Sequence, residues 1–303
     1  MSEQQRTALD ELLRAAPLDL GGDVNEQRAV FEEMMAATPP LDDVATSPGT
    51  LGGIPVVTVD VNGADAGQVI LYLHGGGYAI GSAALAVGLA SDLSRRVGVR
   101  LISVDYRLAP EHPHPAAVND AVAAYRGLLD GGLPPSAIAI AGESAGAGLA
   151  AASLVALESA GLPQPSSAVL MSPWVDLTLS GDSITEKAAL DPVLTPEGLG
   201  LRAADYAAAS DPADGLISPL FADLSELPPL LVQAGSHEIL LDDATRLAAR
   251  AAAADVAVTL EVTPGVPHVF QGFASSVDEA DAALTRAAEF LRAHLGRSLG
   301  GDR

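Results

Sequence analysis

Short apolar runs rich in β-branched residues alternate with alanine-rich stretches along most of the chain. The short runs predict strands and the alanine-rich stretches predict helices. The predicted strands cover residues 54–61, 69–74, 100–104, 138–142, 168–172, 230–234 and 258–262. The predicted helices cover residues 3–16, 24–37, 83–97, 115–129, 145–160, 240–254 and 277–295.

This alternation of strands and helices is typical of an α/β protein, in which a mostly parallel sheet carries helices on both faces. Two segments break the rhythm, because residues 1–50 predict only helices and about residues 177–218 predict no strand. We therefore interpret residues 1–303 as a single domain, with a catalytic core of residues 51–176 and 219–303. The two irregular segments are expected to form a helical cap over the sheet.

Composition and charge exclude several classes of function. Hydrophobic residues make up 49% of the chain and charged residues 18%, which is enough apolar material for a large interior. The net charge of −23 opposes binding to nucleic-acid phosphates or anionic lipid, and the absence of cysteine excludes disulfides and thiolate chemistry. No signal-peptide pattern and no apolar run of roughly 20 residues is present. We predict a cytoplasmic protein without stable membrane insertion.

Ser144 is the candidate nucleophile. It is the central residue of a G-x-S-x-G sequence, Gly142 to Gly146, that follows one predicted strand and begins the next predicted helix. Small residues two positions before and after the serine allow the sharp turn of a nucleophile elbow, which exposes the serine hydroxyl above the strand ends. The alternative interpretation is a serine that caps the N-terminus of the helix.

A second glycine-rich motif, His74-Gly75-Gly76-Gly77-Tyr78, follows the predicted strand 69–74. Such a loop exposes backbone N–H groups, which stabilise the oxyanion that forms during acyl transfer. A phosphate-binding loop is the alternative. It is disfavoured because neither G-x-G-x-x-G nor the Walker lysine is present.

His268 and Glu238 are the candidate base and acid. His268 lies in the loop after the last predicted strand, where a base can reach the carboxyl edge of a parallel sheet. His237 and His74 are weaker rivals. Glu238 is the first acidic residue after the sixth predicted strand, and its main rival, Asp242, lies in the first turn of the next helix. The resulting order of nucleophile, acid and base is that of the α/β-hydrolases.

Together these motifs resemble those of the bacterial hormone-sensitive-lipase-like esterases, family IV, of the α/β-hydrolase fold. The resemblance covers about residues 69–273 and rests on residues 74–77, 105–113, 142–146, 172–177 and 267–268. It implies a mostly parallel eight-stranded sheet. It also implies hydrolysis of carboxylic esters, usually with short to medium acyl chains, without a metal or an organic cofactor.

The resemblance also implies roles for individual residues. It assigns the oxyanion hole to three backbone amides, those of Gly75, Gly76 and Ala145. His74 is expected to orient the glycine-rich loop, and Arg107 is expected to pair with Asp120 beneath the site. Many relatives have Asp followed by Pro where this chain has Glu238-Ile239, and Asp where it has Glu143. Glu143 either lines the pocket beside the nucleophile or is solvated.

We therefore predict a serine carboxylesterase that acts on small-molecule esters through Ser144, His268 and Glu238 and an acyl-enzyme intermediate. Two alternatives stay open: a lactone or amide hydrolase with the same triad, and a ligand-binding protein on this scaffold without turnover. A homodimer through the last strand and the C-terminal helix is compatible with the apolar residues 256–262.

Overall fold

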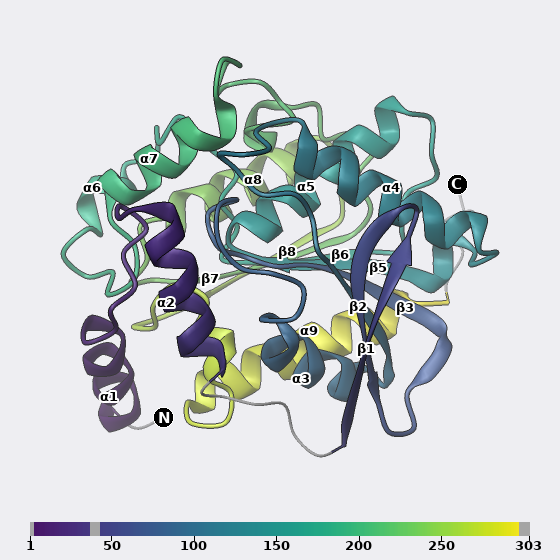
Figure 1. Cartoon of the computed structure of the whole chain (residues 1–303), viewed down its shortest axis with the longest axis horizontal. Coiled ribbons are helices and arrows are strands. Elements are labelled where there is room, and N and C mark those ends of the chain that lie inside the picture. The colour runs from purple at the N-terminus through teal and green to yellow at the C-terminus, as the bar shows by residue number, and fades with distance from the viewer. Residues whose placement is uncertain (1–2, 37–42, 297–303) are drawn as a thin grey trace.

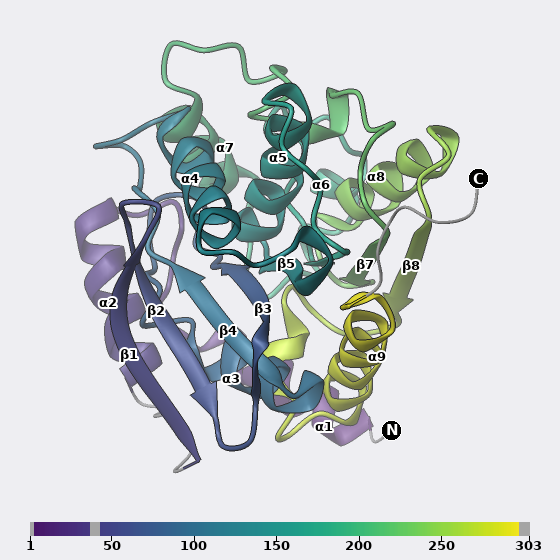
Figure 2. The same cartoon turned by 90° about the vertical axis from the view of Figure 1, so that its right-hand side faces the viewer.

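The computed structural model describes residues 3–36 and 43–296. An eight-stranded, mostly parallel sheet is covered by helices on both faces (Figures 1 and 2), which confirms the predicted α/β-hydrolase fold. Residues 37–42 of the predicted cap, including the last residue of the predicted helix 24–37, lie outside the described part of the chain.

Six of the eight strands run parallel and carry the site at their carboxyl ends. The strands are β1 (Val44–Leu51), β2 (Ile54–Val61), β3 (Asp65–Leu73), β4 (Val99–Val104), β5 (Ile138–Glu143), β6 (Ala168–Met171), β7 (Leu230–Gly235) and β8 (Val258–Thr263). Their order is β1-β2-β4-β3-β5-β6-β7-β8. β1 pairs antiparallel with β2 and β2 antiparallel with β4, whereas all later neighbours pair in parallel.

One boundary of the predicted cap is wrong. Residues 44–50 belong to the sheet as β1, with Val44 opposite Val61 of β2. The six central residues of β1 are exposed, and they include Pro48 and Gly49. No hydrophobic alternation marks this strand in the sequence, because its backbone pairing with β2 holds it in place and no buried side-chain face does.

Nine helices are found in the described residues. They are α1 (Glu3–Arg14), α2 (Val24–Ala36), α3 (Val87–Val97), α4 (Ala116–Asp130), α5 (Ala145–Ser159), α6 (Ser183–Glu186), α7 (Pro196–Ala207), α8 (Leu241–Ala253) and α9 (Asp278–His294). Figure 2 shows α4, α5 and α8 on one face of the sheet and α3 and α9 on the other. None of these helices is long and apolar enough to cross a membrane.

The central strands are buried on both faces because each face of the sheet packs against its own set of helices. On β3, Leu71 and Leu73 join the core beneath α4 and α5, whereas Ile70 and Tyr72 join the core beneath α3 and α9. All four side chains are at most 1% exposed. This explains the unbroken apolar run at the end of this strand.

Arg28 binds α2 to the segments around the glycine-rich loop. Its Nε donates to the carbonyl oxygen of Ala79 at 2.9 Å, and its Nη2 donates to that of Ala109 at 3.0 Å. The same guanidinium pairs with Glu111 at 2.7 Å and lowers the pKa of that carboxyl to about 2. The helix α2 is therefore attached to the part of the sheet edge that carries the candidate chemistry.

Candidate active site

Ser144 lies at the turn between β5 and α5 and adopts φ 55° and ψ −124°, a backbone conformation that is strained for a residue with a side chain. Close backbone packing requires glycine on both sides of it. A β-carbon on Gly146 would lie 2.0 Å from the carbonyl oxygen of Leu73, and one on Gly142 would lie 2.5 Å from that of Gly146. The sharp strand-to-helix turn predicted around Ser144 is thus present.

The structure brings the three predicted catalytic side chains together from three loops. His268 Nε2 lies 2.8 Å from Ser144 Oγ, and His268 Nδ1 lies 2.6 Å from Glu238 Oε2. Because Glu238 can only accept when ionised, the ring proton belongs on Nδ1, which leaves Nε2 free to accept from the serine hydroxyl. This arrangement suits a serine that loses its proton to histidine during nucleophilic attack.

Glu238 is fully buried, and its second oxygen accepts the N–H of Gly235 at 2.7 Å. Burial raises the pKa of Glu238, while hydrogen bonds from His268, Gly235 and Ser172 oppose the rise by favouring the ionised form. Ser172 also accepts the N–H of Val269, next to the histidine, at 3.0 Å. Sequence reasoning quoted the motif that contains Ser172 but missed its role in positioning both acid and base.

The rivals for these roles lie elsewhere. Asp242 accepts the backbone N–H of Ser183 at 2.9 Å and is hydrogen-bonded to α6 instead of to His268. His237 donates its backbone N–H to Val266, and its ring is not part of the triad contacts. The first acidic residue after β7 is therefore the one that meets the histidine, as the order of the motifs predicted.

His74 is buried and organises the glycine-rich loop. Its Nδ1 lies 2.8 Å from the carbonyl oxygen of Gly75, and its ring stacks on Tyr106 with centroids 4.3 Å apart. Tyr106 in turn donates its hydroxyl to the carbonyl oxygen of His74 at 2.7 Å. Burial lowers the pKa of His74 to about 4, so the ring is neutral at pH 7 and positions backbone, as the resemblance implied.

Glu143 is a partly buried acid that lies directly before Ser144 in the sequence. Its carboxyl group is hydrogen-bonded to the hydroxyl of Tyr72 and accepts the N–H of Gly75 at 2.8 Å. Burial raises the pKa of Glu143 to about 7, against the opposite effect of these two hydrogen bonds. Glu143 is therefore hydrogen-bonded to the glycine-rich loop and is not fully solvated. The interpretation that it lines the pocket stays a prediction.

This contact corrects the predicted oxyanion hole at one position. The N–H of Gly75 already donates to Glu143, so it is not available to a substrate oxygen. By contrast, no hydrogen bond formed by the described residues uses the N–H of Gly76, Gly77 or Ala145. Ala145 is the first residue of α5, where the N–H groups lack partners within the helix and carry the positive end of its dipole.

Comparison with known proteins places the chain in a family. The family model of the α/β-hydrolase fold matches residues 70–272. A Streptomyces hygroscopicus protein named acetyl-hydrolase is 41% identical over 283 residues, which is 92% of this chain and 93% of the relative. An esterase of Acinetobacter venetianus is 38% identical, over 93% of this chain and 94% of the relative.

Among solved structures, that of an esterase from the bacterial hormone-sensitive lipase (HSL) family has a TM-score of 0.93 and 43% identity. The match covers 98% of this chain and 100% of that one. The chain belongs to the bacterial HSL family of α/β-hydrolases. The resemblance drawn from the motifs is thereby confirmed, and so is the enzyme class, a carboxylic ester hydrolase.

The ion pair expected in this HSL-family protein is present. Arg107 Nη2 lies 2.6 Å from Asp120 Oδ1, and the backbone N–H of Arg107 donates to the other carboxylate oxygen at 2.9 Å. Asp120 is buried, whereas half of the Arg107 side chain is exposed. The pair anchors the loop after β4 to α4.

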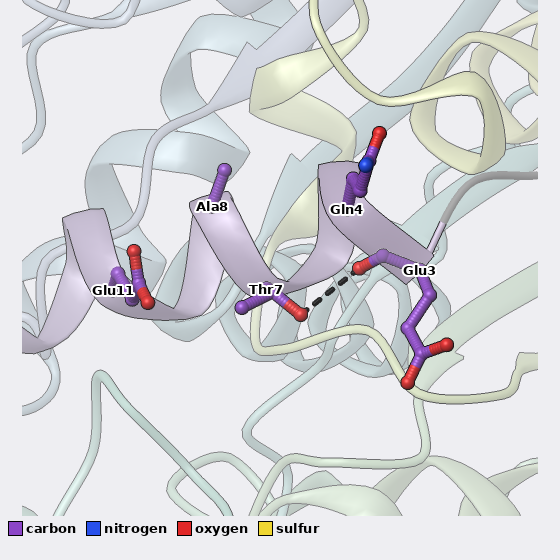
Figure 3. A pocket seen from close by; sticks show the side chains of 5 residues that line it. All are labelled: Glu3, Gln4, Thr7, Ala8 and Glu11. Carbon is purple, nitrogen blue, oxygen red and sulfur yellow. Dashed lines mark hydrogen bonds between the residues drawn. The ribbon is translucent and has the colours of Figure 1, made fainter.

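A surface hollow on the HSL-family protein lies apart from these residues. Figure 3 shows that its lining comes from one helix, α1, through Glu3, Gln4, Thr7, Ala8 and Glu11. Thr7 donates its hydroxyl to the backbone carbonyl of Glu3, and none of the triad residues borders the hollow. In the described part of the chain, no group of three or more His, Cys, Asp or Glu side chains is arranged to hold a metal ion.

Proposed function

We propose that this protein is a serine carboxylesterase that cleaves small-molecule esters with short to medium acyl chains. The hydrogen-bonded series of Ser144, His268 and Glu238, with separations of 2.8 and 2.6 Å, carries the proposal. The strained backbone at Ser144 and the neighbouring N–H groups at the start of α5 add to it.

In the proposed reaction, His268 Nε2 takes the proton of Ser144 Oγ as that oxygen attacks the ester carbonyl carbon. The bond to the alcohol oxygen then breaks, and the histidine gives its proton to the departing alcohol. Water attacks the acyl-enzyme with the same histidine as base, which releases the acid. Glu238 holds the imidazole tautomer and stabilises the imidazolium.

The oxyanion of the tetrahedral intermediate is proposed to bind the N–H groups of Gly76, Gly77 and Ala145. This set replaces Gly75, whose N–H donates to Glu143, with Gly77, whose N–H is free among the described residues. Loss of one such donor raises the activation free energy by about 3–4 kcal/mol in comparable sites.

The surroundings of the site are also part of the proposal. We assign α1, α2 and the segment 177–218, which contains α6 and α7, to the cap. β8 is the last strand of the sheet, and its Leu260 and Val262 are 38% and 40% exposed, so this edge suits a homodimer. Light scattering of the purified protein tests the dimer. The cytoplasmic location stays a prediction.

The test is hydrolysis of p-nitrophenyl esters from acetate to laurate by the wild type and by Ser144→Ala. Ser159→Ala, at the other end of α5, is the matched control because its side chain only donates to the carbonyl oxygen of Val155. We expect turnover to vanish in Ser144→Ala, with an unchanged circular dichroism spectrum, and to persist in Ser159→Ala.

The same assay separates the alternatives. Turnover of lactones or p-nitroanilides in place of esters, with the same dependence on Ser144, would favour a lactone or amide hydrolase. A folded wild type that turns over none of these substrates would overturn the proposal in favour of a binding protein without catalysis.

A further inference from the structure

Arg202 on α7 is a buried cation with unpaired donors. Only 6% of the residue is exposed, and its Nη2 pairs with Asp205 at 3.1 Å. Its Nε and Nη1 are buried and find no acceptor among the described residues. Buried N–H groups of a charged side chain are costly to leave unpaired, so these two donors suit an acceptor supplied by a ligand.

Arg202 lies beside the same glycine-rich loop that contacts the nucleophile. A β-carbon on Gly77 would lie 3.1 Å from Cγ of Arg202, so the arginine stem packs against that residue. A β-carbon on Gly75 would lie 3.2 Å from Cβ of Ser144. The α-carbons of Gly75 and Gly77 are at most about 8 Å apart along the backbone. The same short loop therefore borders both Ser144 and the stem of Arg202, which places the arginine next to the segment that a bound ester would contact.

Charge selects the kind of group that would bind there. The chain carries a net charge of −23, so its surface as a whole repels an anion. Near the glycine-rich loop, the guanidinium of Arg202 supplies a desolvated positive charge that Asp205 compensates through one nitrogen only. Carboxylate oxygens form the strongest hydrogen bonds with guanidinium N–H groups.

We propose that Arg202 is a specificity-determining residue that binds the free carboxylate of an ester bearing a second, unesterified carboxyl group. The inference rests on the proposed esterase function and names the substrate class of that same site. Neutral esters use the triad without this contact, whereas a carboxylate-bearing ester gains hydrogen bonds to Nε or Nη1 of Arg202.

Two pairs of esters test the proposal, each with a neutral partner of matched shape. Monomethyl glutarate and methyl 5-oxohexanoate carry the difference on the acyl side, and 4-acetoxybutanoate and 5-acetoxypentan-2-one carry it on the alcohol side. Hydrolysis is followed by pH-stat titration with the wild type and Arg202→Met. Arg126→Met is the control, because Arg126 is an exposed arginine on α4 and its loss changes the net charge equally.

In at least one pair, we expect Arg202→Met to lower kcat/KM for the carboxylate ester by about 10- to 100-fold, as for the loss of a hydrogen bond between charged groups. The change should fall mainly on KM, and the neutral partner should keep its rate. The pair that responds identifies the side of the ester that faces Arg202. The control should leave both pairs unchanged. Equal losses on charged and neutral esters would overturn the proposal and assign Arg202 a structural role.

Asp205→Asn provides a second test that does not require replacing the buried arginine. Replacing this partly exposed carboxylate with a neutral amide removes a charge that repels the carboxylate of the ester, so kcat/KM for the responding carboxylate ester should rise. An unchanged or lower value would contradict the proposal. Hydrolysis of the neutral esters tests the esterase function separately. If this hydrolysis depends on Ser144, the esterase function is supported even when the carboxylate esters show no effect of Arg202.

Discussion

Replacing Glu143 by glutamine should change how the stability of the protein depends on pH. The buried carboxyl has its pKa raised from an ordinary 4.5 to about 7, chiefly because burial disfavours its charged form. The folded state therefore holds this proton more tightly than the unfolded chain does. Between pH 4.5 and about pH 7 the folded state therefore binds more protons than the unfolded chain, and the free energy of unfolding falls as the pH rises.

The magnitude follows from the two pKa values. Each unit of difference between the two pKa values corresponds to about 1.4 kcal/mol, so the free energy of unfolding falls by about 3 kcal/mol in total as the pH rises. About 2.5 kcal/mol of this fall lies between pH 5 and pH 8. Glu143→Gln removes this titration but keeps an oxygen that can accept the N–H of Gly75. The free energy of unfolding of the variant, relative to that of the wild type, should therefore rise by about 2.5 kcal/mol from pH 5 to pH 8.

Urea unfolding of both proteins at pH 5 and pH 8, followed by circular dichroism, measures this difference. Other titrating groups, including Glu238 and His74, are present in both proteins, so their contributions cancel in the comparison. Glu158→Gln is the matched control, because its carboxylate is exposed on α5 and solvated in both states. A difference between Glu143→Gln and the wild type that is the same at both pH values would refute the reasoning.

Two further predictions address the acid and the elbow. Glu238→Ala should lower kcat by about 10³- to 10⁴-fold, as for loss of the acid in comparable triads. Asp242→Ala should keep a kcat close to that of the wild type. A larger loss of kcat in Asp242→Ala than in Glu238→Ala would remove Glu238 from the triad. Gly146→Ala should destabilise the fold by more than about 3 kcal/mol, because the new β-carbon would lie 2.0 Å from the carbonyl oxygen of Leu73. Gly88→Ala, in the first turn of α3 with nothing within 4 Å, should instead leave the free energy of unfolding unchanged or raise it slightly in the same urea titration. Similar losses in both variants would contradict the packing argument.

The fold and the meeting of Ser144, His268 and Glu238 could be predicted because each leaves a local signal in the sequence. Ser144, Glu238 and His268 all follow strands, and parallel strands bring such positions to one edge. β1 could not be predicted in the same way, since its exposed central residues carry no alternation.

The details of the site depend on packing between distant segments, which no local pattern records. Nothing near Gly75 indicates that its N–H is taken by Glu143, 68 residues later in the chain. Likewise, Arg202 is one arginine among many in the sequence, and only the position of α7 beside Gly77 distinguishes it. These are contacts made by side chains whose neighbours are set by the tertiary structure.

The attachment of α2 by Arg28 has a consequence for the order in which the chain assembles. The acceptors of Arg28 lie 51 to 83 residues later, at Ala79, Ala109 and Glu111, so α2 is synthesised before any of them. The helix α2 can make these contacts only after the chain has been synthesised to Glu111, because a long loop must close before the contacts stabilise it. Although α2 is synthesised before the segments that carry its acceptors, it is therefore expected to become ordered after them.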